Sequence, residues 1–155
     1  MQRLHRLLQH WRSTKKQARE IFSASALEHV EHILHHSPPL HRFNVKLAIE
    51  VALPAHAVLR KTSARARACT LFARHHPMQD VNHRHTLIYI NLADRRVEII
   101  NDPLTTQLLA ADQWDTVCRH ITDGFKNGDP VSGISHALNN LAAMLESTEL
   151  PIQRE

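Results

Sequence analysis

The pattern of hydrophobic and polar positions is clearest over residues 85–102, where it predicts two strands joined by a turn. Residues 86–92 are apolar at alternate positions on both faces, which is typical of a central strand that is covered on both sides. The polar residues 93–96 then predict a hairpin turn, and the β-branched run 97–101 predicts its second strand. Pro103 follows that strand, and a proline ends it because it has no N–H group to donate.

Elements of helical and strand periodicity surround this hairpin. Strict alternation over residues 43–51 predicts an earlier strand of more edge-like character. Helical spacing over residues 63–76 predicts a helix that crosses from that strand to a parallel neighbour, as in a βαβ unit. Further helices are expected from about Ala26, after a cap at Asp112, and from Asp129-Pro130. The order predicts an α/β fold, a three-layer α/β/α sandwich with a small mixed central sheet (βαββ core) and flanking helices.

The first twenty residues form a pattern of their own. Apolar side chains at helical spacing predict a basic amphipathic helix over residues 1–20, followed by one domain over residues 21–151 and a short tail over residues 152–155. This helix is expected to pack on the domain, or alternatively to contact an anionic membrane surface or a partner. The side chains that would make such a contact are Arg3, Arg6, Arg12, Lys15 and Lys16.

Composition excludes some classes of partner and leaves others open. The 155 residues carry 19 basic and 15 acidic side chains, a formal charge of +4, which does not call for a nucleic acid. Cys69 and Cys118 lie in apolar helical patterns, which predicts free, buried thiols and a reducing compartment. No apolar run approaches the roughly 20 residues of a membrane span, and no signal peptide follows Met1. We therefore expect a cytoplasmic protein with an unidentified protein partner, or one peripheral to the inner membrane.

Motifs of catalysis are missing from the sequence, and candidate ligands collect near the predicted hairpin. The chain has three glycines, none in a phosphate-binding loop, and it has neither a G-x-S-x-G nor an H-E-x-x-H motif. It has fourteen histidines, of which His83 and His85 lie with Asp80 and Asn82 in the loop before the central strand. Asn101 and Asp102 end the second strand of the hairpin, and ligands of open α/β sheets usually bind beside strand ends.

Several segments, in order, resemble the TPM domain family, over about residues 21–151. They are IFSASALEHVEHIL, AIEVALP, RARACTLFA, LIYINLADRRVEIINDP, QWDTVCRHI and ISHALNNLAAML, of which LIYINLADRRVEI is the most specific. The resemblance implies an α/β/α sandwich whose acidic cleft can hold a divalent cation such as calcium. Some members of the family, in plant chloroplasts, are described as acid phosphatases or photosystem-repair factors. Bacterial members are associated with the cell envelope.

Departures from the family pattern set the functional expectation. Of the family's acidic positions only Asp102 is kept, and amides stand in the implied cleft at Asn44, Asn82 and Asn101. Calcium needs several converging oxygen ligands, commonly six or more, so the acidic site is expected to be degenerate. We therefore expect a non-catalytic binding or scaffold protein linked to the bacterial cell envelope. The alternatives are a divalent-metal-dependent, phosphatase-like enzyme with its site near Asp102, and peripheral membrane association through residues 1–20. The sequence identifies no definite cofactor. If a divalent cation binds, the metal ligand set Asp102, Asp80, His83 and His85 would favour zinc or nickel over calcium or magnesium.

Overall fold

The computed structural model describes residues 20–51, 53, 57–58, 60–75 and 84–148. The predicted helix over residues 1–20 therefore lies outside the described residues, apart from Glu20, and so do Asp80, Asn82, His83 and the tail. The labelled elements are α3 (Ala24–His36), α4 (Pro38–Arg42), β1 (Val45–Glu50), α6 (Ala64–His75), β2 (Thr86–Asn91), β3 (Arg96–Asn101), α7 (Pro103–Thr106), α8 (Ala111–Lys126) and α9 (Pro130–Thr148).

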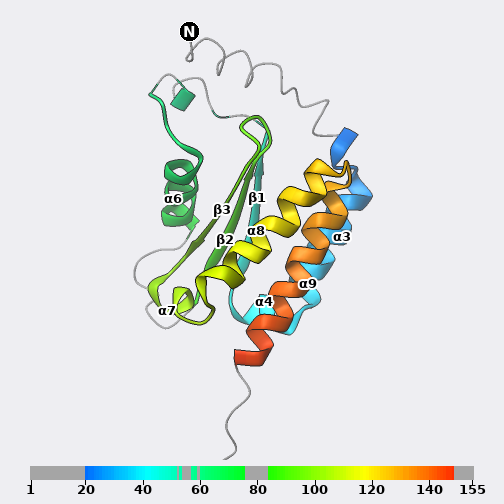
Figure 1. The fold of residues 1–155 in the computed structure, drawn as a ribbon, viewed down its shortest axis with the longest axis vertical. Coiled ribbons are helices and arrows are strands. Elements are labelled where there is room, and N and C mark those ends of the chain that lie inside the picture. The colour runs from blue at the N-terminus through cyan, green and yellow to red at the C-terminus, as the bar shows by residue number, and fades with distance from the viewer. Residues whose placement is uncertain (1–19, 52, 54–56, 59, 76–83, 149–155) are drawn as a thin grey trace, which may run out of the picture.

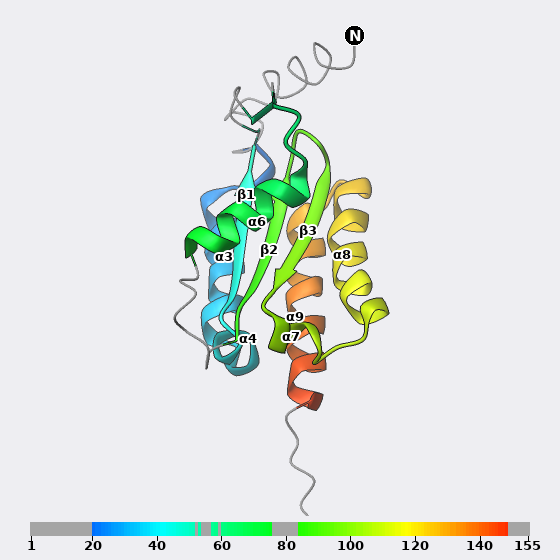
Figure 2. The same ribbon diagram turned by 90° about the vertical axis from the view of Figure 1, so that its left-hand side faces the viewer.

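A three-stranded mixed sheet forms the middle layer of the fold. The strand order is β1-β2-β3, with β1 parallel to β2 and β3 antiparallel to it. Helix α6 covers one face of the sheet, and α3, α8 and α9 lie on the other (Figure 1). Figure 2 shows α6 crossing in front of the three strands. The predicted α/β sandwich with its small mixed sheet is therefore confirmed, as are the parallel crossover and the hairpin.

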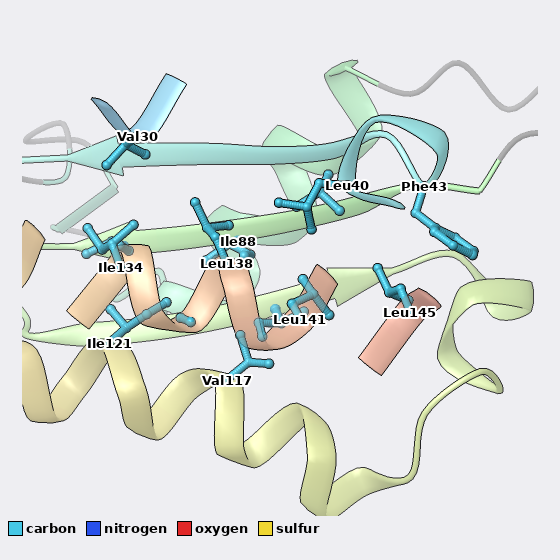
Figure 3. Close-up of a cluster of buried hydrophobic side chains, with 14 of the residues drawn as sticks. Val30, Leu40, Phe43, Ile88, Val117, Ile121, Ile134, Leu138, Leu141 and Leu145 are labelled. Atoms are coloured by element: carbon cyan, nitrogen blue, oxygen red, sulfur yellow. The ribbon is translucent and has the colours of Figure 1, made fainter. Parts of the chain in front are cut away.

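Side chains of β2 alternate between two hydrophobic cores. Ile88 and Ile90 belong to the larger core, which they share with α8 and α9, and Ile88 is fully buried (Figure 3). Leu87 and Tyr89 face α6 and pack with its apolar side chains, among them Ala68. Because every residue of β2 is buried, the run of apolar residues 87–90 is explained by cover on both faces.

Helices α8 and α9 cross at two glycines. A Cβ atom built on Gly133 would lie 2.7 Å from the Cα atom of Gly124 and 2.7 Å from the carbonyl oxygen of His120. The two backbones are therefore in contact at this point, and no side chain larger than hydrogen fits between them. This close crossing brings the end of α8 next to the start of α9.

Helix boundaries differ from the prediction where a capping side chain was misassigned. Helix α3 begins at Ala24, because Ser23 is its N-cap and accepts a hydrogen bond from the backbone of Ala26 at 3.2 Å. The predicted start near Ala26 was two residues late. Similarly, α8 is preceded by Ala110, whose N–H group donates to the side chain of Gln113 at 2.9 Å, and Asp112 is already inside the helix.

Three further predictions were inexact. The strand expected over residues 43–51 is limited to Val45–Glu50, and Phe43 instead ends α4 with its ring fully buried. The hairpin turn consists of residues 92–95, one position earlier than predicted. Both cysteines are free, but Cys69 is exposed on α6 and only Cys118 is partly buried. Among the residues that the structure describes, no helix combines the length and apolar character needed to span a bilayer.

Candidate functional site

Polar side chains gather at both ends of the sheet, and the strand directions distinguish these ends. Since β3 is antiparallel to β2, Asn101 lies opposite Thr86, beside the start of β2. Asn101 and Asp102 thus lie beside strand ends, as predicted, but at the amino end of β2. The usual ligand position of open α/β sheets is at the carboxyl ends of parallel strands. Those ends are at Glu50 and Asn91. We call the two regions the α7 end and the hairpin end (Figure 1).

Asp102, the acidic residue of the α7 end, is the N-cap of α7. Its Oδ1 atom accepts a hydrogen bond from the N–H group of Thr105 at 2.8 Å. Its Oδ2 atom accepts from the hydroxyl of Thr105 at 2.7 Å and also from the N–H group of His85. The carboxylate thus joins the first turn of α7 to the residue that precedes β2. It has an identified structural role, which the Asp102-Pro103 sequence could have suggested, since aspartate at the N-cap and proline at the next position are typical of a helix start.

The protonation of Asp102 reflects these contacts. Burial alone would raise the pKa of this carboxyl group, because it removes water from the charged form. Hydrogen bonds from Thr105, His85 and the backbone of Leu104 act in the opposite direction and outweigh it, so the pKa is lowered from its ordinary value. The folded structure therefore favours the ionised carboxylate.

Two of the three amides predicted to line a cleft are also found at the α7 end. Asn44 has a positive φ of 43° and donates from Nδ2 to the carbonyl oxygen of Arg84 at 3.1 Å. Asn101 accepts a hydrogen bond from the hydroxyl of Thr86 at 2.8 Å. The structure therefore brings Asn44, Asn101, His85 and Asp102 to one end of the sheet, and each contacts a neighbouring segment.

The other predicted metal ligands cannot be placed in this group. Asp80, Asn82 and His83 lie outside the described residues, so zinc or nickel binding stays a prediction. Within residues 20–51, 60–75 and 84–148 and the few described positions between them, no three His, Cys, Asp or Glu side chains are placed to hold a metal ion.

At the hairpin end a polar network lies between the sheet and α6. The Arg67 guanidinium binds the Glu50 carboxylate from Nη2 at 2.6 Å and from Nε at 3.1 Å. The Tyr89 hydroxyl donates to Glu50 at 2.7 Å, and the Asn91 side chain donates to the Tyr89 oxygen at 3.3 Å. The Arg67 side chain is only 18% exposed, because it turns toward the sheet.

This network shifts the proton affinity of its members. Burial, together with the bond to the charged Glu50, raises the pKa of the Tyr89 phenol, so Tyr89 stays protonated and acts as a donor. The hydrogen bond to Glu50 likewise raises the pKa of Arg67. The negative charge of Glu50 is therefore matched inside the protein. Sequence inspection missed this pairing because it depends on the parallel register and on the rotation of α6.

On the opposite face of the hairpin end the structure has a groove, which was not predicted. It lies between the β2–β3 turn, the last turn of α8 and the residues before α3, and its volume is about 990 Å³. Among the described residues that line it, three are cationic and one is acidic. The described lining is Glu20, Ile21, Val51, Ile90, Asn91, Leu92, Ala93, Arg95, Arg96, Val97, Thr122, Phe125 and Lys126. The sequence offered little sign of this groove, since Arg95 and Arg96 are typical of a polar turn.

Comparisons with known proteins agree with this architecture. A family model described as the TPM domain matches residues 41–144. The NMR structure of the BA42 protein from the psychrophilic bacterium Bizionia argentinensis superimposes with a TM-score of 0.67, covering 82% of this chain and 83% of that chain. Sequence identity to BA42 is 17%, so the likeness concerns the fold. None of the curated proteins matches the sequence.

Proposed function

The chain belongs to the TPM domain family, whose model covers residues 41–144, and from this premise we propose that it is a non-catalytic binding protein of the bacterial cell envelope. The envelope location follows the association of other bacterial members of the family. The α7 end, where the family's acidic cleft would lie, supports the absence of catalysis.

The main observation behind this proposal is that the carboxylate of Asp102 is already hydrogen-bonded within the protein. A metal-dependent phosphatase places cations on the phosphoryl oxygens, and those cations are held by carboxylates whose lone pairs are available. A carboxylate has about four acceptor positions. In Asp102 at least three of them are used, by Thr105 and His85. Binding a cation there would displace hydrogen bonds that hold α7 and β2 together.

The neighbouring side chains support the same interpretation. Where carboxylates would supply negative charge, the α7 end has the neutral amides of Asn44 and Asn101. Each of these amides already bonds to another segment. Charge stabilisation of a transition state by a bound cation requires several such oxygen ligands to converge. The α7 end therefore serves better as a rigid support than as a reaction centre.

Replacing Asp102 with asparagine tests this proposal. With magnesium, calcium or manganese we expect no appreciable hydrolysis of a phosphomonoester by the wild-type protein, and no change in Asp102→Asn. The variant should instead be less stable by about 1–2 kcal/mol, because asparagine can still cap α7 but cannot accept the bonds on both oxygens. Colorimetric phosphate release and chemical unfolding measure the two effects.

Asp112→Asn is the matched control, since Asp112 is exposed on the first turn of α8. It should leave both stability and turnover near the wild-type values. Metal-dependent hydrolysis by the wild type that disappears in Asp102→Asn but persists in Asp112→Asn would contradict the proposal and favour the phosphatase alternative.

A further inference from the structure

The groove at the hairpin end lies where the strand directions favour ligand binding. Val51 follows β1, and residues 90–93 end β2 and begin the turn, so the groove adjoins the carboxyl ends of both parallel strands. Crevices outside these ends are the usual ligand sites of open α/β sheets. The α7 end, with Asp102, is at the other end of the same strands. The two regions can therefore be tested separately.

The interior of the groove is apolar. Ile90 is 2% exposed, and Leu92, Val97 and Phe125 are partly buried members of the larger core. Together with Ile21, which is 38% exposed, these side chains form an apolar wall that continues from the core to the surface. Such a surface favours a ligand with an apolar body, because covering it removes hydrocarbon from water.

The uncharged polar residues of the groove are already engaged with the protein. The Asn91 side chain accepts from the Asp94 N–H group at 3.0 Å and donates to Tyr89. The Thr122 hydroxyl donates to the carbonyl oxygen of Arg119 at 3.1 Å. A peptide or nucleotide in the groove would need partners for its own polar groups. Apart from the cationic side chains at its rim, the groove offers few, so an unbranched hydrocarbon chain fits its interior better.

The rim of the groove is cationic. Arg95 and Arg96 at the hairpin tip and Lys126 at the end of α8 are exposed, and Glu20 is the acidic side chain among the described lining residues. Within the described part of the chain these three cations form no ion pair. Three positive groups against one negative group favour an anionic head group, whose oxygens can accept several charge-assisted hydrogen bonds.

Backbone strain at the tip of the β2–β3 hairpin also indicates a binding role for the cationic rim. Arg95 has a φ of 52°, in the left-handed region where glycine or asparagine is usually found. An L-residue with a Cβ atom pays roughly 1 kcal/mol or more for that conformation. Such strain is concentrated at functional sites, where another requirement outweighs it. Here the requirement would be a guanidinium group at the mouth of the groove.

We propose that the groove binds a single-chain anionic amphiphile, a long-chain carboxylate or alkyl phosphate. Its hydrocarbon chain lies along Ile21, Leu92 and Phe125, and its head group contacts Arg95, Arg96 and Lys126. The volume of about 990 Å³ is at the upper end of the range for small-molecule sites and can accept such a chain. This inference names a ligand class for the proposed binding role and rests on that role for its biological meaning.

Isothermal titration calorimetry of the full-length protein tests the ligand class. The probe is laurate below its micelle concentration, with dodecyl phosphate to compare head groups. Dodecyl maltoside and dodecyltrimethylammonium provide neutral and cationic heads on the same chain. We expect saturable binding of one laurate or dodecyl phosphate, and at least tenfold weaker binding of the other two. Equal affinity for all four would overturn the proposal, because it would show hydrophobic binding without a role for the cations.

Substitutions distinguish an effect of the cationic rim on laurate binding from an effect on the stability of the protein. Arg95→Gly combined with Arg96→Gln should weaken laurate binding at least tenfold, although glycine relieves the strain at position 95 and Tm should not fall. Arg74→Gln, an exposed change on α6, is the matched control and should bind laurate like the wild type. Leu92→Trp should block the groove. Laurate binding that is unaffected by both sets of groove changes would show that the ligand is bound elsewhere and would overturn the proposal.

Two further measurements test whether a membrane surface or residues 1–19 of the chain occupy the groove instead. Binding to vesicles of anionic phospholipid with none to monomeric laurate would identify a membrane surface as the partner. Tighter laurate binding by the full-length variant Leu7→Gln with Leu8→Gln would show that residues 1–19 compete for the groove. The first result would overturn the proposal, whereas the second would support it, because competition requires laurate to bind in the groove. The phosphate-release assay on Asp102 does not depend on the groove, so a failure here leaves the proposed non-catalytic role standing.

Discussion

Replacing Ile88 with alanine is expected to lower the free energy of unfolding by about 2–5 kcal/mol. Ile88 is fully buried at the middle of the central strand, and it lies opposite Leu47 on β1 and Ile99 on β3. Its side chain contributes to the core that the sheet shares with α8 and α9 (Figure 3). Truncation removes three carbon atoms that are shielded from water and leaves a cavity, because strands paired on both sides cannot move inward to fill it.

Chemical unfolding followed by circular dichroism measures this loss. Leu104→Ala is the matched control, since Leu104 is 53% exposed on α7 and its removal should change stability by less than about half a kcal/mol. If Ile88→Ala changed stability as little as the control does, β2 would not be the central element of the core.

Replacing Gly133 with alanine is expected to destabilise the protein by about 3 kcal/mol. In an ordinary helix the change would stabilise by up to about 1 kcal/mol, because alanine has the higher helix propensity. Here the new methyl group would meet backbone atoms of α8 at 2.7 Å, and backbone cannot turn aside as a flexible side chain can. A loss of stability in Gly133→Ala, in place of the usual gain, would therefore indicate that α8 and α9 cross in close contact.

Gly128 provides the control for this change. It has a positive φ of 76°, and an added Cβ atom there would have no neighbour within 4 Å. Gly128→Ala should cost about 1–2 kcal/mol through backbone strain alone. Thermal unfolding of both variants gives the comparison. A Gly133→Ala protein as stable as the wild type, or more stable, would show that the two helices are further apart.

The parts of the fold that follow from local periodicity could be predicted from the sequence. The alternation through Leu87, Ile88, Tyr89 and Ile90 identified both faces of β2, since each side chain must enter one core or the other. The polar break before Val97 identified the hairpin, and Asp129-Pro130 identified the start of α9. These signals depend on residues close together in the chain, which is why they were sufficient.

The site was less predictable because it depends on how distant segments meet. Glu50, Arg67 and Tyr89 lie on different elements, and nothing local indicates that they form one network. The groove likewise requires the end of α8 and the residues before α3 to reach the hairpin tip. Asp102 was different: its pattern with Pro103 was present in the sequence, but its position in the hairpin suggested a strand end rather than a helix cap.

The two ends of the sheet thus have different chemistry. At the α7 end the carboxylate of Asp102 and the amides of Asn44 and Asn101 hold Thr105, His85, Thr86 and Arg84 in place. At the hairpin end the carboxylate of Glu50 is matched by Arg67 on one face, and the groove with its cationic rim lies on the other. We infer that the hairpin end of the sheet binds the ligand of this chain. The α7 end instead keeps the fold rigid.

The pH dependence of unfolding tests the structural role of Asp102 most directly. The pKa of this carboxyl group is lowered in the folded protein, whereas in the unfolded chain it should be near the ordinary value of about 3.9. The folded state therefore binds fewer protons. The resulting stability is fully present above the unfolded pKa and is lost as pH falls through the folded pKa.

The measurement compares the wild type with Asp102→Asn by chemical unfolding from neutral pH to below about pH 3, with and without calcium. Carboxyl groups common to both proteins cancel in the difference between them. We expect the wild type to be the more stable at neutral pH, the difference to shrink in acid, and calcium to leave it unchanged. A difference that does not depend on pH would show that the ionised carboxylate of Asp102 does not stabilise the fold. A difference that grows when calcium is added would show that this carboxylate is available to a cation.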